Sequence, residues 1–387
     1  MKPFNYFQPT EIRFGRGRLR QLGKAAVRYG TRALLVTVPA TETLGPVIAK
    51  ARASLEAAGL AVSHFEGVVP NPTTDSIAAG SAVAREHQAD LVVGVGGGSS
   101  LDTAKAIAVQ VTHAGTCWDY LFDKAAPSDR TLPVIAVTTT SGTGSHVTQV
   151  AVATNTPLRT KSYLCDRQLF PRLAIVDPEL MVTAPRQVTA MTGWDAWTHA
   201  FEAYLHKACS PYVAMLALEA IRLVAANLPP LLEDLDNLEL RTAMAWADTL
   251  AGLCIANAGV TLPHSVGMAI SGRWPAVAHG ASLAVVYPAF TRYTAAAAVP
   301  QFAAVGRILN PELATASDAD AAAQCCVEMD LLLQRIGLWI DLDGLGVPAS
   351  EFDALADQSL QLPDYRNNPR TPTRDEIRAL LDQCRVR

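Results

Sequence analysis

The first half of the chain alternates short apolar runs with stretches of helical periodicity. We interpret the short runs as strands of a buried parallel sheet, at residues 32–38, 61–65, 91–95 and 133–137. The segments between them carry apolar side chains at helical spacing, at residues 47–58, 74–87 and 101–111. This rhythm predicts an α/β fold, an open parallel sheet with helices on both faces.

Beyond Pro185 the strand pattern nearly disappears. Helical periodicity dominates residues 188–207, 211–227, 238–257 and 321–336. A last helix is expected over residues 373–382, because Thr373 and Glu376 form a capping-box pattern. We therefore predict an α/β domain over residues 1–185 and an all-helical domain over residues 186–387.

Composition and charge limit the classes of binding partner and the cellular compartment that fit this chain. Half of the residues are hydrophobic and 18% are charged, as in an ordinary globular protein. The formal net charge of -4 and the absence of a basic stripe argue against a nucleic-acid partner. The seven cysteines form no CxxC pair, which indicates a reduced compartment. The N-terminal segment does not resemble a signal peptide and no apolar stretch is long enough for a membrane span, so we expect a cytoplasmic protein.

Four residues of the second half suggest a metal site. Asp195 and His199 lie four positions apart in GWDAWTHAFEAY and share one face of the predicted helix. His264, in a loop or at a helix start, and His279 follow downstream. One carboxylate and three imidazoles suit Fe²⁺, with Zn²⁺ as the alternative. A lone Asp-x-x-x-His is usually a local hydrogen-bonded pair, so the prediction rests on all four residues, which we take as catalytic through the metal.

Two other polar residues of the same segment are not predicted as ligands. His206 lies two turns beyond His199, about 10 Å along the helix axis, too far to share the ion. We interpret His206 and Glu202 either as ordinary polar helix residues or as residues that support the ligands from outside the inner ligand set.

Two glycine-containing loops follow predicted strands. VVGVGGGSSLDTAKAIA is a strand, three glycines and a helix, an arrangement that brings backbone N–H groups close to a phosphate. It is not the common GxGxxG fingerprint. The loop at residues 138–145, TTTSGTGS, is rich in hydroxyl groups and glycine and also follows a strand. Together the two loops favour a nucleotide site.

In family order, several segments resemble the iron-containing (group III) alcohol dehydrogenases. The matching segments are FQPTEIRFGRG at 7–17, NPT at 71–73, GGGSSLDTAKA at 96–106, TTSGTGS at 139–145, IVDPEL at 175–180, GWDAWTHAFEAY at 193–204, the histidine segment 264–280 and NPR at 368–370. The resemblance implies an N-terminal dinucleotide-binding domain and a C-terminal helical metal- and substrate-binding domain. It also implies one aspartate and three histidines as metal ligands, and a homodimer.

The resemblance places the cofactor residues too. It implies that Gly97, Gly98 and Ser99 hold the pyrophosphate of NAD or NADP. It assigns the rest of the cofactor site to Asn71, Asp102, Thr139, Thr140, Thr148 and Lys161.

Three positions depart from the family pattern. Met268 stands where many members carry a histidine thought to relay the alcohol proton, and His146 stands where glutamate is usual. Val38 replaces an aspartate that in many NAD-preferring members binds the ribose hydroxyls and repels a 2′-phosphate. With no acidic group there, we favour NADP.

The expected activity is reversible hydride transfer between the nicotinamide and a small primary alcohol or aldehyde bound to the metal. Tryptophans 194, 197, 246 and 274 either narrow the substrate pocket or pack in the helical core. One alternative is a glycerol dehydrogenase-like polyol oxidoreductase with zinc, although its glycine loop usually continues with lysine rather than Ser99. A second is a dehydroquinate synthase-like cyclase, a lyase that usually carries glutamate in place of Asp195.

Overall fold

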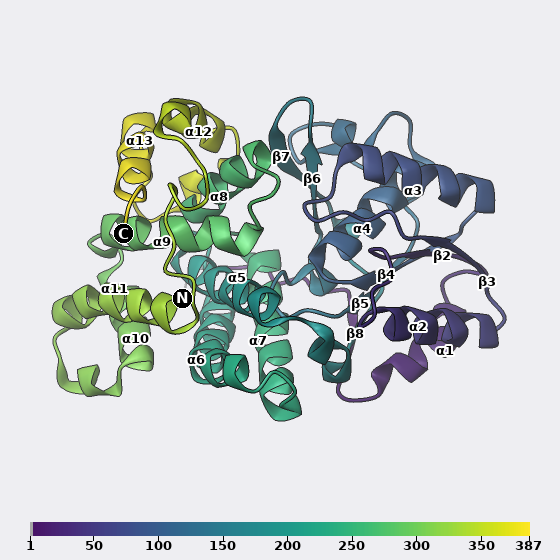
Figure 1. Cartoon of the computed structure of the whole chain (residues 1–387), viewed down its shortest axis with the longest axis horizontal. Coiled ribbons are helices and arrows are strands. Elements are labelled where there is room, and N and C mark those ends of the chain that lie inside the picture. The colour runs from purple at the N-terminus through teal and green to yellow at the C-terminus, as the bar shows by residue number, and fades with distance from the viewer. Residues whose placement is uncertain (1–2) are drawn as a thin grey trace. The chain divides into compact units, whose positions relative to one another are not determined.

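Two units make up the chain in the computed structural model, which describes residues 3–387 (Figure 1). The α/β unit comprises residues 7–185 and 236–245, and the helical unit comprises residues 3–6, 186–235 and 246–387. We keep a domain boundary after residue 185 as a proposal. Residues 236–245, which include the start of a long helix, group with the α/β unit and were not predicted to do so.

The α/β unit contains the strands of the described chain. They are β1 (Glu11–Phe14), β2 (Arg32–Val36), β3 (Ala61–Phe65), β4 (Leu91–Gly96), β5 (Val134–Thr138), β6 (Val150–Asn155), β7 (Thr160–Cys165) and β8 (Leu173–Val176). The α-helices of this unit are α1 (Leu22–Ala26), α2 (Gly45–Ala57), α3 (Thr74–His87) and α4 (Gly98–Thr112). Short 3₁₀ helices are η1 (Arg18–Gln21), η2 (Cys117–Tyr120), η3 (Ser145–Val147), η4 (Arg167–Leu169) and η5 (Pro178–Thr183).

Six of these strands form one parallel sheet in the order β1-β8-β5-β4-β2-β3. The chain leaves β2 towards β3 on one side and β4 towards β5 on the other, so the connections diverge between β2 and β4. In open parallel sheets, ligands bind at the carboxyl ends of the strands beside such a switch point. The loops that follow β2 and β4 are therefore the expected ligand-binding loops of this unit.

Side chains alternate between the two faces of the sheet and bury both of them. Leu34, Val36 and Val92 pack with residues of α3 and α4, including Ile107. The neighbouring positions 33, 35 and 93 pack on the opposite face with residues of α1 and α2. The predicted parallel sheet with helices on both faces is thus confirmed (Figure 1).

The helical unit is built from helices joined by short connections. They are α5 (Arg186–Leu205), α6 (Pro211–Glu233), α7 (Leu238–Asn257, whose first residues group with the α/β unit), α8 (Leu262–Arg273), α9 (His279–Ala295), α10 (Val299–Leu309), α11 (Asp318–Arg335), α12 (Phe352–Ser359) and α13 (Arg374–Gln383). The 3₁₀ helices here are η6 (Pro311–Thr315), η7 (Ala349–Glu351) and η8 (Pro363–Asn367).

Element boundaries differ from the sequence prediction where glycine or proline is involved. The helix predicted from Leu101 begins at Gly98, because Gly97 is its N-cap and Gly98, Ser99 and Ser100 form its first turn. The helix predicted to end at Asn227 continues through Pro229 and Pro230 to Glu233. Strands β1 and β8 and the antiparallel hairpin β6–β7 were not predicted at all.

Helix α6 is long and apolar enough to cross a membrane by length and composition alone, which the sequence interpretation did not recognise. The core helix of a soluble protein passes the same test. Val213, Ala217, Ile221 and Val224 of α6 are buried at helical spacing within the unit, and the helix packs against α5.

The capping box at the start of α13 is confirmed and can be tested. The Thr373 hydroxyl accepts a hydrogen bond from the Glu376 N–H, and the Glu376 carboxylate accepts one from the Thr373 N–H. Thr373→Ala should cost about 1 kcal/mol, which lowers the Tm of a unit this size by about 2–4 °C. Thr373→Ser keeps the hydroxyl and should leave the Tm unchanged in thermal unfolding of the full chain. Equal Tm values for the Ala and Ser variants would contradict the cap.

Candidate functional site

One face of α5 presents polar side chains to the interior of the helical unit. Asp195, His199 and Glu202 follow one another at intervals of four and three residues, so they share that face. Asp195 is 3% exposed, His199 5% and Glu202 0%. On the same helix Trp194 and Trp197 are fully buried and stack with their ring centroids 6.1 Å apart. The helix therefore buries an aromatic surface and a charged surface at once.

The other two predicted ligands come from α8 and α9. His264 is the third residue of α8 and His279 opens α9. Gly280 allows the start of α9 to approach α5 closely, because a Cβ at this position would lie 2.3 Å from the Met191 carbonyl oxygen. A residue other than glycine would push His279 away from α5.

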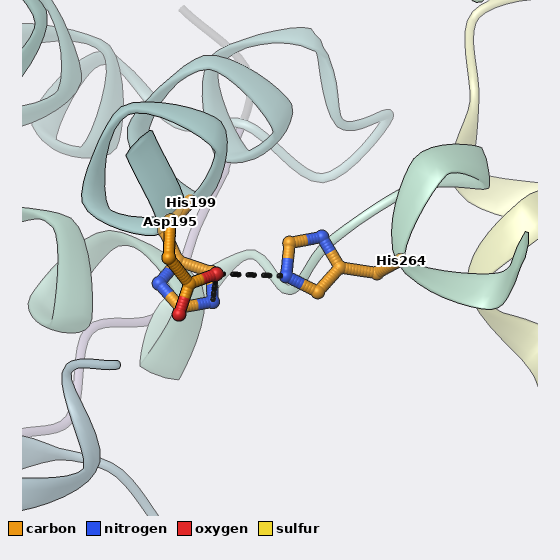
Figure 2. A group of neighbouring side chains, drawn as sticks. All are labelled: Asp195, His199 and His264. Atoms are coloured by element: carbon orange, nitrogen blue, oxygen red, sulfur yellow. Dashed lines mark ion pairs between the residues drawn. The ribbon is translucent and has the colours of Figure 1, made fainter. Parts of the chain in front are cut away.

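Three of the four predicted ligands converge tightly (Figure 2). One ligand atom from each of Asp195, His199 and His264 lies within 4.8 Å of the others. The Asp195 Oδ1 is 3.5 Å from the His199 Nε2 and 3.8 Å from the His264 Nε2. Ligand atoms about 2.1 Å from a tetrahedral ion lie about 3.4 Å apart. The observed spacing therefore fits one small divalent ion.

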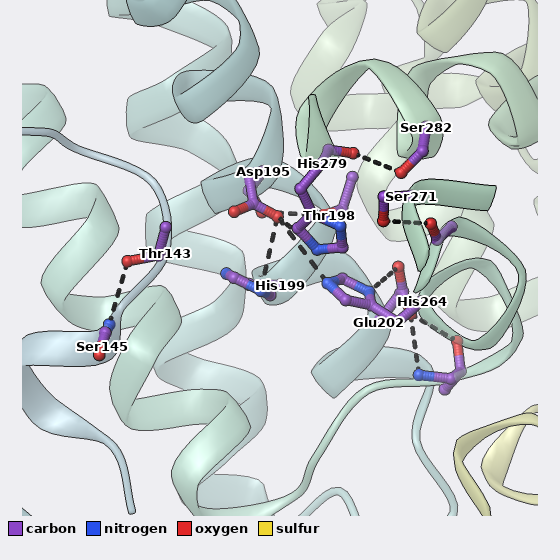
Figure 3. Close-up of polar contacts among 12 residues, drawn as sticks. Thr143, Ser145, Asp195, Thr198, His199, Glu202, His264, Ser271, His279 and Ser282 are labelled. Atoms are coloured by element: carbon purple, nitrogen blue, oxygen red, sulfur yellow. Dashed lines mark hydrogen bonds and ion pairs between the residues drawn. The ribbon is translucent and has the colours of Figure 1, made fainter. Parts of the chain in front are cut away.

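His279 lies at the same centre but less tightly. Its Nε2 is 3.8 Å from the Asp195 Oδ1, and its ring meets that of His264 edge-on with centroids 5.3 Å apart. Its side chain is 25% exposed, and it lies outside the group formed by Asp195, His199 and His264. Figure 3 shows the His279 ring beside Asp195 and His264. His279 is thus the most accessible of the four predicted ligands.

Glu202 is a site residue whose role the sequence interpretation left open. Its Oε1 accepts a hydrogen bond of 2.8 Å from the Nδ1 of His264, on the opposite side of the ring from Asp195 (Figure 3). Glu202 therefore lies outside the inner ligand set, as predicted, but its bond to a ligand was left open as one of two readings. The available signal was its spacing, since Glu202 lies seven residues, or about two turns, after Asp195 on the same helix face.

The electrostatics of this centre favour positive charge. Burial by itself lowers the pKa of His264, but the charge and hydrogen bond of Glu202, together with the charge of Asp195, raise it above its usual value. Burial and the Glu202 charge raise the pKa of Tyr287 well above its usual value, so its phenol stays neutral. The Tyr287 hydroxyl donates to the Glu202 Oε1 at 3.1 Å.

His206 stays outside this centre, as predicted. Burial lowers its pKa to about 4, and its Nδ1 accepts a hydrogen bond from the Ala208 N–H at the end of α5. Met268 lies one turn after His264 on α8 and is 5% exposed. Its thioether carries no transferable proton. Of the four tryptophans, Trp194 and Trp197 belong to the core, whereas Trp246 is 40% exposed.

In the α/β unit, two loops lie against each other: the glycine loop at residues 96–98 and the Thr/Ser loop at residues 138–145. Gly97 caps α4, and the Thr139 N–H donates to the Gly96 carbonyl at 3.0 Å. A Cβ on Gly98 would lie 2.5 Å from the Thr143 side chain, and one on Gly97 would lie 3.1 Å from the Thr140 side chain. The close approach of the two loops therefore requires glycine at both positions.

Helix α4 also fixes the segment after the Thr/Ser loop. Asp102 accepts hydrogen bonds from the Ser145 hydroxyl at 2.6 Å and from the Val152 N–H at 3.2 Å. One turn later, the fully buried Lys105 donates to the carbonyl oxygens of Thr148 and Val150, at 2.9 and 2.7 Å. Asp102 therefore organises the loop in this structure, in addition to any contact with a cofactor.

Burial shifts the titration of this internal network. It raises the pKa of Asp102, a rise that the Lys105 charge and the Ser145 hydrogen bond partly offset. Burial lowers the pKa of Lys105 to about 8, although the negative charge of Asp102 offsets part of this decrease. Burial lowers the pKa of His146 to about 3, and the positive charge of Lys105 lowers it further. His146, which stands where glutamate is usual, is therefore neutral and fully buried.

Asn71 and Lys161, both predicted to contact the cofactor, contact each other. The Lys161 Nζ donates to the Asn71 Oδ1 at 2.9 Å. Asn71 has a φ of 53°, in the left-handed region, and the Thr154 N–H donates to the Pro72 carbonyl at 2.7 Å. The loop after β3 is thus tied to the β6–β7 hairpin.

Comparison with known proteins identifies the family. The family described as "Iron-containing alcohol dehydrogenase" matches residues 9–178, and "Fe-containing alcohol dehydrogenase family, C-terminal" matches residues 189–384. The chain is 34% identical to a 1,3-propanediol dehydrogenase of Klebsiella pneumoniae over 98% of each chain. It is 31% identical to an NAD-dependent methanol dehydrogenase of Bacillus methanolicus over 97% of this chain and 98% of the relative.

A solved structure gives the same assignment. A variant of an archaeal halo-thermophilic alcohol dehydrogenase from a Red Sea brine pool superimposes with a TM-score of 0.94 at 30% identity, over 99% of this chain and 100% of that one. The resemblance drawn from the sequence motifs is therefore confirmed. This chain belongs to the iron-containing alcohol dehydrogenase family and is an oxidoreductase of that family.

Proposed function

We propose that this chain catalyses reversible hydride transfer between a nicotinamide dinucleotide and a small primary alcohol or aldehyde, with Asp195, His199, His264 and His279 holding one divalent metal ion. The observation that carries the proposal is the buried cluster of Asp195, His199 and His264, whose ligand atoms have the spacing of a tetrahedral site.

The chemistry of His264 supports a cation at this cluster. The Glu202 carboxylate can only accept hydrogen bonds, so in the neutral His264 ring, the form that binds a metal, the one proton lies on Nδ1. The buried Nε2 then faces the Asp195 Oδ1 with a lone pair and makes no hydrogen bond in the described chain. With the ring in this neutral form, two acceptors 3.8 Å apart repel each other, and a divalent cation between them removes the repulsion.

Nitrogen and oxygen ligands of this kind suit Fe²⁺, and Zn²⁺ is the alternative. When bound, such an ion acts as a Lewis acid that stabilises the alkoxide of the alcohol or polarises the aldehyde carbonyl. The chain's own residues position the ion, and the burial of Asp195, His199 and His264 keeps bulk water away from their side of it. His279, which is the most accessible ligand, would border the substrate side.

For the dinucleotide, we propose that Gly97, Gly98 and Ser99 bind the pyrophosphate at the start of α4. The proposal is supported by the glycine-dependent contact between the two loops and by the position of α4 after β4 at the switch point of the sheet. The remaining proposed cofactor residues are Asn71, Asp102, Thr139, Thr140, Thr148 and Lys161.

NADP is the proposed preference between the two dinucleotides, although the Bacillus methanolicus relative is an NAD-dependent enzyme. Val38 follows the carboxyl end of β2, beside the switch point, where an acidic side chain would repel a 2′-phosphate. Val38 is partly buried against the core and carries no charge.

The proposed substrate class is a small primary alcohol or its aldehyde. Relatives act on 1,3-propanediol and on methanol, both of which are small primary alcohols. We also propose that the chain is a cytoplasmic homodimer without nucleic-acid or membrane partners. Gel filtration with light scattering tests the oligomeric state directly.

Removal of a ligand tests the metal proposal. His199→Ala should lose the bound metal and lower kcat/KM for aldehyde reduction at least about 100-fold, since a Lewis acid contributes several kcal/mol to transition-state stabilisation. His87→Ala, in the α/β unit, is the control and should retain both the bound metal and the wild-type kcat/KM. Metal content by mass spectrometry and a panel of C1–C6 aldehydes with NADH and NADPH provide the readout. If His199→Ala keeps wild-type metal content and activity, the ligand assignment fails.

Substitution of Val38 tests the dinucleotide preference. Like charges about 4 Å apart repel by about 1 to 4 kcal/mol, so Val38→Asp should raise the KM for NADPH about 10-fold or more while leaving the KM for NADH unchanged or lower. Val38→Asn, which has the same shape without the charge, should change the KM for NADPH much less. A wild-type protein that uses NADH alone, or an unchanged KM for NADPH in Val38→Asp, would contradict the proposal.

A further inference from the structure

Glu202 receives four hydrogen bonds at a site where no solvent reaches it. Its Oε1 accepts from the His264 Nδ1 at 2.8 Å and from the Tyr287 hydroxyl at 3.1 Å. Its Oε2 accepts from the N–H and the hydroxyl of Thr261, at 2.8 and 3.2 Å. Because every partner is a donor, the carboxylate is saturated and its orientation is fixed.

From this arrangement, and resting on the proposed metal site, we infer that Glu202 is a positioning residue that holds His264 as the Nδ1–H tautomer with its Nε2 directed at the metal. A ring with the proton on Nε2 could not donate that lone pair. Hydrogen bonds of this kind also raise the basicity of the ligating nitrogen.

Glu202 positions the helix that carries His264 as well as the ring. Thr261 is the N-cap of α8, and its own side chain makes no capping bond to the helix. Instead its N–H and hydroxyl both donate to the Oε2 of Glu202. The carboxylate on α5 therefore holds the N-cap of α8, three residues before His264.

Tyr287 secures the carboxylate from the other side. It is 1% exposed, and its ring packs edge-on against Trp194 with centroids 5.0 Å apart. Its hydroxyl therefore cannot turn to water. The packing of the Tyr287 ring thus helps to fix the position of the Glu202 carboxylate.

Charge provides a second role for the same residue. The hydrogen-bond partners of Glu202 in the described chain include no lysine or arginine. An uncompensated carboxylate in the interior costs several kcal/mol. A divalent ion balances the charges of Asp195 and Glu202 together, so Glu202 should increase metal affinity through charge as well as geometry.

Replacement of the carboxylate by its amide tests the inference. In Glu202→Gln the amide has the same shape but only one acceptor oxygen, so it cannot serve both Thr261 and His264 as Glu202 does. We expect its affinity for Zn²⁺ or Co²⁺, measured by competition with a chelator, to fall about 10- to 100-fold. The visible spectrum of the Co²⁺-loaded protein should shift because the His264 ligand is displaced.

Two further variants separate positioning from general stability. Glu328→Gln changes a buried carboxylate elsewhere in the helical unit, bonded to Asn310 and Gln324, and should leave the metal affinity at the wild-type value. Tyr287→Phe keeps the ring and removes one of the four bonds, so it should weaken metal binding several-fold. It also keeps the inference testable if Glu202→Gln does not fold.

The outcomes distinguish this inference from the proposed function. If the wild-type chain binds neither Zn²⁺ nor Co²⁺, the metal site itself fails. If the wild-type chain binds metal and the folded Glu202→Gln and Tyr287→Phe variants bind it equally well with an unchanged Co²⁺ spectrum, the site stands and the role of Glu202 is overturned. The role of Glu202 is also overturned if Glu328→Gln loses as much metal affinity as Glu202→Gln.

Discussion

Two carboxylates buried on one face of α5 are the constraint on which the helical unit depends. Asp195 and Glu202 are 3% and 0% exposed, and an interior carboxylate is stable only where donors or cations surround it. The chain surrounds Glu202 with hydrogen-bond donors from α8 and α9, and it places imidazoles around Asp195. A divalent ion would complete the surroundings of Asp195.

In the α/β unit, one sheet and one helix hold the loops of the proposed dinucleotide site in place. Its parallel sheet brings the loops after β2, β4 and β5 to one edge, and α4 holds the last two together. Asp102 and Lys105, one turn apart, bind the two parts of the segment from Ser145 to Val152. An anion at the start of α4 would thus meet backbone that is already fixed, which lowers the entropic cost of binding.

The sequence predicted features that depend on local pattern. Strand β3 and helix α3 have the predicted bounds, and the capping box of α13 is present, because apolar periodicity and a Thr-x-x-Glu spacing act within a few residues. The start of α4 was misplaced because glycine has low helix propensity, and only contacts with Thr140 and Thr143 explain its use there.

Long-range pairing accounts for what sequence reasoning could not supply. Strand β1 is held by its register with β8, far away in the chain, so its own four residues carry little signal. The sequence left the role of Glu202 open because that role depends on a hydrogen bond with His264, 62 residues away. Conversely, the sequence left Trp194 and Trp197 open between the substrate pocket and the core, and their full burial and mutual stacking assign them to the core.

X-ray absorption spectroscopy of the Zn²⁺-loaded protein tests the central claim most directly. The account predicts one ion per chain with only nitrogen and oxygen ligands at about 2.0–2.2 Å and outer-sphere scattering from three imidazole rings. Sulfur ligands at about 2.3 Å, scattering from a single imidazole ring, or no tightly bound ion would contradict it.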